Sequence, residues 1–155
     1  MKPLMVVACL LAASLFVGCD TISASIRTVT VARLPTASTV VAALNATPGV
    51  QRVSQREVPA STSWGLYDGV IRDPAFNQFT FNTATTGGTL ETKQDSKGVM
   101  TLRLYCMWMN HTPPKAKFDT TRALLDAVYV SLRRADPSLP PPSELKETLV
   151  RYPSK

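Results

Sequence analysis

Histidine and cysteine are scarce in this chain of 155 residues, which contains one histidine and three cysteines. Two of the cysteines, Cys9 and Cys19, lie within or at the end of an apolar N-terminal segment, so Cys106 and His111 are the residues of these types beyond it. One histidine and one cysteine cannot build the closed ligand set of a structural zinc site. We therefore expect no metal centre and no other cofactor. A single remaining thiol also leaves no partner for a disulfide.

Residue combinations that carry catalysis are equally scarce. Cys106 and His111 could form a thiol–imidazole pair, but Cys106 alternates in register with apolar residues such as Leu102, which favours a buried and inert thiol. Asp68 and Asp73 could serve as paired carboxylates, yet turn and capping roles are the more ordinary use of acidic residues in such a segment. No glycine-rich loop leads into a lysine and a helix, which excludes a phosphate-binding loop of that type. We predict that the protein is not an enzyme.

The chain also has no block of like charges, although its formal net charge is +6 at pH 7. Arg133-Arg134 is the one adjacent basic pair, and the other basic residues are scattered. A scattered distribution is typical of an ordinary solvated surface. Attraction to anionic lipid head groups is the functional alternative.

What is present begins with an uncharged run rich in leucine, valine and alanine, residues 3–18, directly after Lys2. A transmembrane helix needs about 20 apolar residues, so this shorter run is typical of a secretory signal. The run closes on Leu15-Phe16-Val17-Gly18-Cys19, which resembles the lipobox of bacterial lipoproteins, with Phe16 where leucine is usual. Two alternatives stay open, namely cleavage by an ordinary signal peptidase and an uncleaved N-terminal anchor.

The lipobox resemblance implies a mature chain that begins at Cys19, with diacylglyceryl on the thiol and an acyl group such as palmitate on the new amine. Two or more acyl chains give stable anchoring, whereas one gives only marginal binding. The implied location is the cell envelope, on a membrane facing the periplasm or the exterior. Asp20 resembles an inner-membrane retention signal of enteric bacteria, which favours the inner membrane. No nucleic acid is expected as a partner of an exported protein.

The sequence predicts four segments along the chain. They are a signal peptide at 1–18, the lipidated cysteine with a short polar tether at 19–25, an α+β domain at 26–135, and a proline-rich connector with a short C-terminal element at 136–155. The prolines of the last segment lack backbone donors, so the connector is expected to be extended.

Hydrophobic periodicity predicts an α+β fold, a mainly antiparallel sheet with two helices packed on one face. The expected strands are 26–34, 50–58, 77–83, 89–94 and 99–110, and the expected helices are 36–44 and 119–135, the second capped by Asp119. Residues 59–75 are expected to form a long connection. Residues 143–152 fit a short helix, which we favour, or an edge strand. The order of the first elements loosely resembles a ferredoxin-like βαβ unit, a topology that many unrelated proteins share.

Aromatic residues near the expected loops are the strongest candidates for recognition. Trp64 and Tyr67 lie in the long connection, and Trp108 and His111 lie at the end of an expected strand. If these segments meet, they form a partly apolar patch that could hold a partner or a ligand; otherwise the two tryptophans fill the core. We therefore expect a non-catalytic, membrane-anchored envelope lipoprotein that docks on another envelope protein. A small-ligand binding module is the alternative, and a small hydrolase is a distant third.

Overall fold

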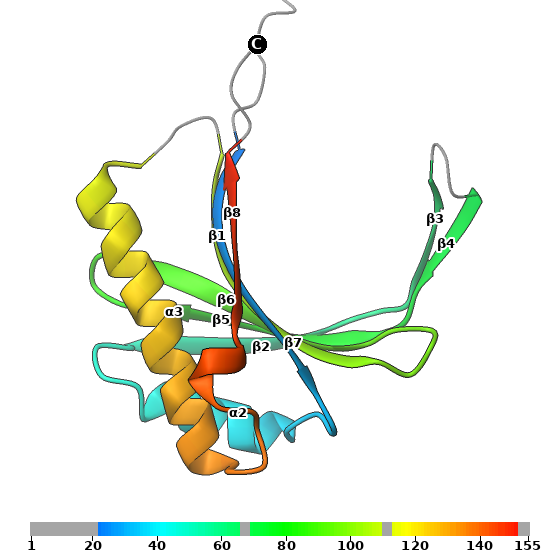
Figure 1. Ribbon diagram of the computed structural model, residues 1–155, viewed down its shortest axis with the longest axis horizontal. Coiled ribbons are helices and arrows are strands. Elements are labelled where there is room, and N and C mark those ends of the chain that lie inside the picture. Colours follow the sequence, from blue (N-terminus) through cyan, green and yellow to red (C-terminus); the bar gives the residue numbers. More distant parts are fainter. Residues whose placement is uncertain (1–21, 66–68, 110–112, 152–155) are drawn as a thin grey trace, which may run out of the picture.

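A computed structural model describes the backbone of residues 22–65, 69–109 and 113–151, and the side chains of residues 23–61, 74–109 and 113–149. In these residues, six strands form one antiparallel sheet in the order β2-β5-β6-β7-β1-β8, and β3 and β4 form a separate hairpin (Figure 1). The expected α+β class, with an antiparallel sheet and two helices, is confirmed. The elements are β1 (Ile22–Val31), α2 (Ala37–Asn45), β2 (Arg52–Val58), β3 (Ser61–Gly65), β4 (Gly69–Asp73), β5 (Phe76–Asn82), β6 (Gly87–Gln94), β7 (Met100–Met109), α3 (Lys115–Ala135), the 3-10 turn η1 (Pro142–Glu144) and β8 (Lys146–Arg151).

The connections follow a simple plan. Every neighbouring pair in the sheet is antiparallel, so β1 and β2 run in the same direction with the meander β5-β6-β7 between them. Helix α2 joins β1 to β2, and helix α3 leads from β7 to β8, which lies on the outer side of β1. This arrangement keeps the outline of a ferredoxin-like split βαβ unit, with a three-strand meander where that unit has one strand.

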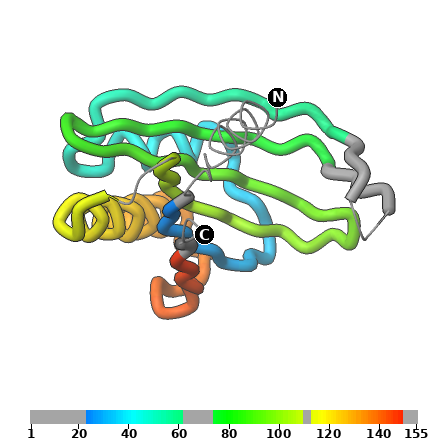
Figure 2. The backbone as a smooth tube through the Cα atoms, turned by 90° about the horizontal axis from the view of Figure 1, so that it is seen from above, coloured from blue at the N-terminus to red at the C-terminus, as the bar shows by residue number. Residues whose placement is uncertain are grey.

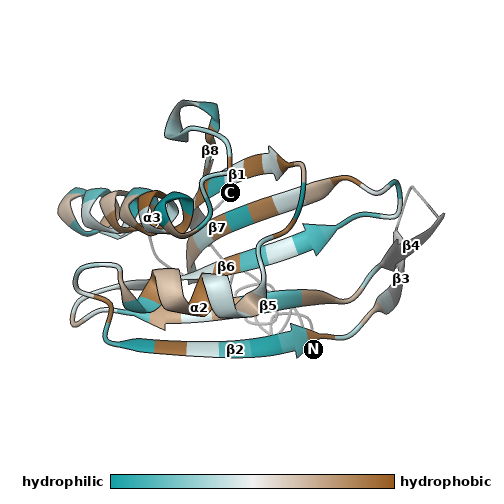
Figure 3. Cartoon of the chain, turned by 90° about the horizontal axis from the view of Figure 1, so that it is seen from below, coloured by the Kyte–Doolittle hydropathy of each residue, from teal (hydrophilic) through white to brown (hydrophobic). Residues whose placement is uncertain are grey.

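Both helices lie against the same face of the sheet, as Figure 3 shows. Helix α2 begins after Thr36, whose Oγ1 accepts a hydrogen bond of 3.2 Å from the backbone N–H of Thr39, the usual role of an N-cap. Apolar residues from α2, α3 and alternate positions of the strands form one core. Its completely buried members are Val40, Leu44, Phe79, Phe81, Leu90, Leu102, Leu104, Leu125, Val128, Tyr129 and Leu132.

Gly88 lets α3 approach the sheet closely. A Cβ atom at this position would lie 2.8 Å from Cζ of Phe81 and 3.0 Å from Cδ2 of Leu125 on α3. Both neighbours are completely buried in the core and have no room to move away. A glycine at this position of β6 is therefore required by packing, not by backbone conformation.

Strand β1 begins earlier than the sequence predicted. Residues 22–25, which we assigned to the tether, pair with β7 from Met109 to Cys106. Ser23 and Ser25 are buried on the helix-facing side. Small polar residues at these positions hide the apolar alternation on which the prediction depended.

The long connection expected at 59–75 is a second correction. Ser61–Gly65 and Gly69–Asp73 pair antiparallel as β3 and β4, with Ser61 opposite Asp73. In Figure 1 this hairpin projects from the end of the sheet opposite to the first turn of α3. Glycine at both inner ends of the hairpin weakened the strand pattern in the sequence.

Helix α3 and the C-terminal element differ from the predictions as well. The helix begins at Lys115 with Pro114 as the N-cap residue, where the missing backbone N–H removes no helical hydrogen bond, so Asp119 is an internal residue and not the cap. The helix favoured for 143–152 is wrong, and the edge-strand alternative is correct, since Lys146–Arg151 pairs with β1. The outer edge of β1 offers backbone donors and acceptors that a short helix could not satisfy. Among the described helices, none has the length and hydropathy required to cross a membrane.

Candidate functional site

The residues proposed from the sequence for recognition lie largely outside the described part of the structure. Cys19, Tyr67 and His111 are outside it, and for Trp64 the backbone in β3 is described without the side chain. Trp108 is only 6% exposed, and its ring packs on Phe118 of α3 with 5.5 Å between the ring centroids. Trp108 is therefore a core residue, as expected if the tryptophans fill the core and do not form a recognition patch.

A different site becomes visible on the face of the sheet that the helices leave open. The strand register places one residue of each of the six strands in a single row across this face. The row runs Arg56, Gln78, Glu91, Arg103, Thr28 and Lys146 from β2 to β8. Leu90 and Leu104, each next to a row residue in the chain, belong to the core, so the row faces away from the helices. Figure 3 shows the face of the sheet that the helices cover, and Figure 2, viewed from the opposite side, shows the open face.

Hydrogen bonds join the first three residues of the row. Nε of Arg56 donates to Oε1 of Gln78 over 2.6 Å, and Nε2 of Gln78 donates to Oε1 of Glu91 over 3.0 Å. The hydroxyl of Tyr105, in the neighbouring row, donates to the same carboxylate oxygen over 2.8 Å. Cross-strand contacts of this kind hold the side chains in fixed positions.

Glu91 is the centre of the network, with only 4% of the residue exposed. Its Oε2 accepts no hydrogen bond, but it lies 3.3 Å from Nζ of Lys93 and 3.7 Å from a guanidinium nitrogen of Arg103. A buried carboxylate needs such cations, because burial of an unpaired charge is strongly unfavourable. Burial, and then the adjacent Glu91 carboxylate, raise the pKa of Tyr105 above its ordinary value, which keeps this hydroxyl a donor.

Both cations next to Glu91 also lie on aromatic rings. Nζ of Lys93 lies 4.0 Å from the centroid of Phe76, and the guanidinium carbon of Arg103 lies 4.8 Å from that of Tyr105. These distances fall within the range of cation–π attraction, about 6 Å. The side chains of Lys93 and Arg103 remain 38% exposed, so part of each charge still faces solvent.

The whole open face is strongly basic. At the strand positions with described side chains that point to this face, Glu91 is the one acidic residue. The basic residues at these positions are Arg52, Arg56, Lys93, Arg103 and Lys146. Because the acid is buried and the cations are partly or fully exposed, the potential of this face is positive.

A cavity of about 360 Å³ opens beside this network. Phe76, Lys93 and Thr101 of the open face line it. The other lining residues are Pro74, Gln94, Asp95, Ser96 and Val99. Its volume is at the lower end of the range for small-molecule sites. Within the described residues, no three His, Cys, Asp or Glu side chains are arranged to hold a metal ion.

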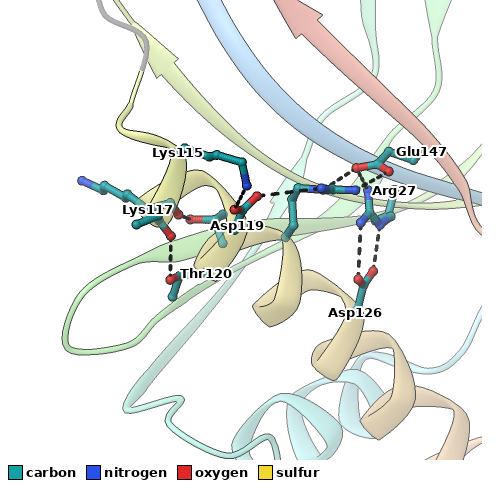
Figure 4. Close-up of polar contacts among 10 residues, drawn as sticks. Arg27, Lys115, Lys117, Asp119, Thr120, Asp126 and Glu147 are labelled. Atoms are coloured by element: carbon teal, nitrogen blue, oxygen red, sulfur yellow. Dashed lines mark hydrogen bonds and ion pairs between the residues drawn. The ribbon is translucent and has the colours of Figure 1, made fainter.

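A second polar network lies on the helix side of the sheet (Figure 4). The side chain of Arg27, 7% exposed, contacts Asp126 of α3 over 2.7 Å and Glu147 of β8 over 2.6 Å. Glu147 also accepts two hydrogen bonds from Arg122, of 2.6 and 2.7 Å. The network ties α3 and β8 to β1 through paired charges, and Nη1 of Arg27 has the Glu147 carboxylate beside it as an ion-pair partner without a well-aligned hydrogen bond. We therefore assign it to stability.

The chain matches no family model, and no curated protein or solved structure is significantly similar to it. The open-face network must therefore be interpreted from its own chemistry.

Sequence reasoning missed this site for a specific reason. Alternation in the sequence places residues such as Gln78 and Arg103 opposite the core, but by itself it does not distinguish them from an ordinary polar surface. The polar residues at alternate positions of the expected strands were the available signal. Strand order and register, which no local pattern contains, were needed to bring them together.

Proposed function

We propose that this protein is a bacterial envelope lipoprotein, anchored through Cys19, that docks without catalysis on an acidic surface of another envelope protein. The observation that carries the proposal is the basic open face, on which, among the described side chains, five cations accompany a single buried acid. Complementary potentials accelerate encounter and exclude partners of the wrong charge. The lipobox resemblance supports the proposed location, and the charge of the open face supports an acidic partner.

The fixed positions of the side chains in the open-face network support a docking role. Arg56, Gln78 and Glu91 are linked by hydrogen bonds of 2.6 and 3.0 Å, and Lys93 and Arg103 lie on aromatic rings. Cations held in this way lose little conformational entropy when a partner binds. An acidic partner therefore meets a surface that is already organised.

A small anionic ligand with an apolar part is the second candidate, favoured by the cavity of about 360 Å³ beside Phe76 and Lys93. An aromatic ring and an ammonium group on one wall suit such a ligand. This alternative uses the same face, but it needs the cavity and not the full row.

The test is co-purification from native membranes in mild detergent, with a C-terminal tag on the full chain. We expect a stoichiometric partner, identified by mass spectrometry, whose recovery falls as salt is raised. Arg52→Glu should reduce recovery about tenfold or more, because a rim cation is replaced by an anion at the interface. Arg52 is exposed on the open face.

Arg134→Glu is the matched control, because it makes the same change of charge at an exposed position near the end of α3. We expect unchanged recovery with this variant, and loss of membrane association with Cys19→Ser. Purification of the wild-type protein without a partner would contradict the docking role. Equal losses with Arg52→Glu and Arg134→Glu would contradict the assignment of the open face.

A further inference from the structure

The start of β1 determines how far the folded part of the chain can be from its anchor. Ile22 is the first residue of β1 and pairs with Met109, the last residue of β7. Only two residues, Asp20 and Thr21, lie between Cys19 and Ile22, and the three residue steps from Cys19 to Ile22 span at most about 11 Å. If Cys19 carries the acyl chains, this end of the sheet lies next to the bilayer.

Exposed apolar side chains gather at the same end. Met107 and Met109 of β7 are 49% and 51% exposed, and they lie in register with Ala24 and Ile22. Leu149 of β8 is 49% exposed and lies in register with Ser25. Five large apolar residues are exposed in the described part of the chain, and three of them therefore lie within the first four rows of β1.

The first turn of α3 is fixed at this end of the molecule, as Figure 1 shows. The contact of 5.5 Å between the rings of Trp108 and Phe118 holds it against β7. Lys115 and Lys117 of this turn are exposed, and the side chain of Lys115 remains 89% exposed beside Asp119. Surfaces that contact lipid head groups typically combine exposed cations with apolar side chains, as this end of the molecule does.

We propose that this end of the sheet, defined by Met107, Met109 and Leu149, inserts into the interface of the bilayer that holds the anchor. The inference rests on the proposed lipidation of Cys19. The sheet then stands on its end, with Lys115 and Lys117 at the head groups. The basic open face points sideways, where a partner can reach it, and does not lie flat on the lipid.

Val99 provides a matched control within the same strand pair. It is 43% exposed and directly precedes β7 at the end remote from Met109. A strand rises about 3.3 Å per residue, so the two positions are up to about 30 Å apart. An upright sheet keeps Val99 in water, whereas a sheet lying flat on its open face brings Val99 and Lys93 to the lipid.

The experiment uses the full lipidated chain with Cys106→Ser, so that a single introduced cysteine can be labelled. Met107→Cys, Met109→Cys, Leu149→Cys and Val99→Cys carry an environment-sensitive nitrobenzoxadiazole label in vesicles of phosphatidylethanolamine and phosphatidylglycerol. Brominated acyl chains then quench labels that reach the interface. We expect quenching at 107, 109 and 149 to exceed that at 99 by about fivefold or more, since interfacial side chains sit about 5–10 Å deep.

Two results would overturn the inference, and they differ in what they say of the anchor. Intact mass spectrometry of the same samples reports the acyl chains on Cys19. Weak quenching at 107, 109 and 149, or strong quenching at 99, in protein of acylated mass refutes the upright orientation alone. A mass without acyl chains refutes the anchor and, with it, this orientation.

Discussion

Replacing Glu147 by glutamine tests whether the network on the helix side holds α3 and β8 in place. The carboxylate of Glu147 contacts Arg27 over 2.6 Å and accepts two hydrogen bonds from Arg122. Glutamine has nearly the same shape but no charge, and it offers one acceptor oxygen instead of two. Arg27, 7% exposed, then keeps only Asp126 as a charged partner.

The exposed fractions of the paired side chains determine how much stability Glu147→Gln should cost. A fully exposed ion pair contributes up to about 1 kcal/mol, and removing one partner of a buried pair costs about 3–5 kcal/mol. Glu147 is 31% exposed and Arg122 is 35% exposed, while Arg27 is buried, so the site lies between these limits. Because Asp126 still pairs with Arg27, the free energy of unfolding should fall by about 1–2 kcal/mol.

The same network makes the effect depend on pH. Burial alone would raise the pKa of Glu147, but the hydrogen bonds from Arg122 and Arg27 outweigh it and hold this pKa below its ordinary value. A carboxylate with a lowered pKa stabilises the fold above its unfolded value of about 4.3, and this stabilisation disappears as the pH falls through the folded value. The difference between wild type and Glu147→Gln should therefore be largest near neutral pH and shrink below about pH 4.

The assay is urea unfolding followed by tryptophan fluorescence at pH 7 and at pH 3.5. Both proteins begin at residue 19 and carry Cys19→Ser, so that neither the apolar run 3–18 nor acyl chains require detergent. Asp119→Asn is the control, because Asp119 is 44% exposed and pairs only with exposed or half-exposed cations, so its loss should cost under about 0.5 kcal/mol. Equal stabilities of wild type and Glu147→Gln at pH 7 would show that the network does not stabilise the fold. A difference that persists unchanged at pH 3.5 would show that the lost stability does not come from the charge of Glu147.

Three further predictions concern the core and the thiol. Gly88→Ala should lower the free energy of unfolding by about 1–3 kcal/mol, because the added methyl group overlaps Phe81; an unchanged urea midpoint would contradict this packing. Tyr129→Phe should lower the free energy of unfolding by about 1 kcal/mol, because it removes the hydrogen bond of 2.8 Å that the buried hydroxyl donates to the carbonyl of Pro140. The same urea unfolding assay measures this loss. Burial raises the pKa of the Cys106 thiol although Lys117 opposes the shift, so at pH 8 dithionitrobenzoate should react about tenfold more slowly with the folded than with the urea-unfolded chain; equal rates would refute it.

The elements that sequence reasoning located correctly have strong local periodicity. The first half of strand β7 alternates apolar and polar residues from Met100 to Leu104, and Phe79 and Phe81 mark the core face of β5 in the same way. Thr36, at the start of the helix expected at 36–44, is the N-cap of α2. Side-chain period and capping depend on neighbours in the chain, so a sequence contains them directly.

The errors occur where distant contacts override a weak local pattern. Residues 22–25 are strand because β7 pairs with them, although their serines suggested a tether. Residues 146–151 are strand because the free edge of β1 accepts them, although leucine spacing favoured a helix. Backbone groups of a sheet edge are satisfied by whatever segment reaches them, and the sequence does not say which segment that is.

The sequence by itself determined the α+β class, the positions of most strands and helices, and the lipobox resemblance at Cys19. It left the basic residues scattered, because they belong to segments far apart in the chain. Only the tertiary structure decided that Arg56, Arg103 and Lys146 share one row across the open face, with Glu91 buried among them. The physical reason is that side-chain period assigns each residue to a face of its own strand, whereas the order and register of six strands arise from hydrogen bonds between segments far apart in the chain.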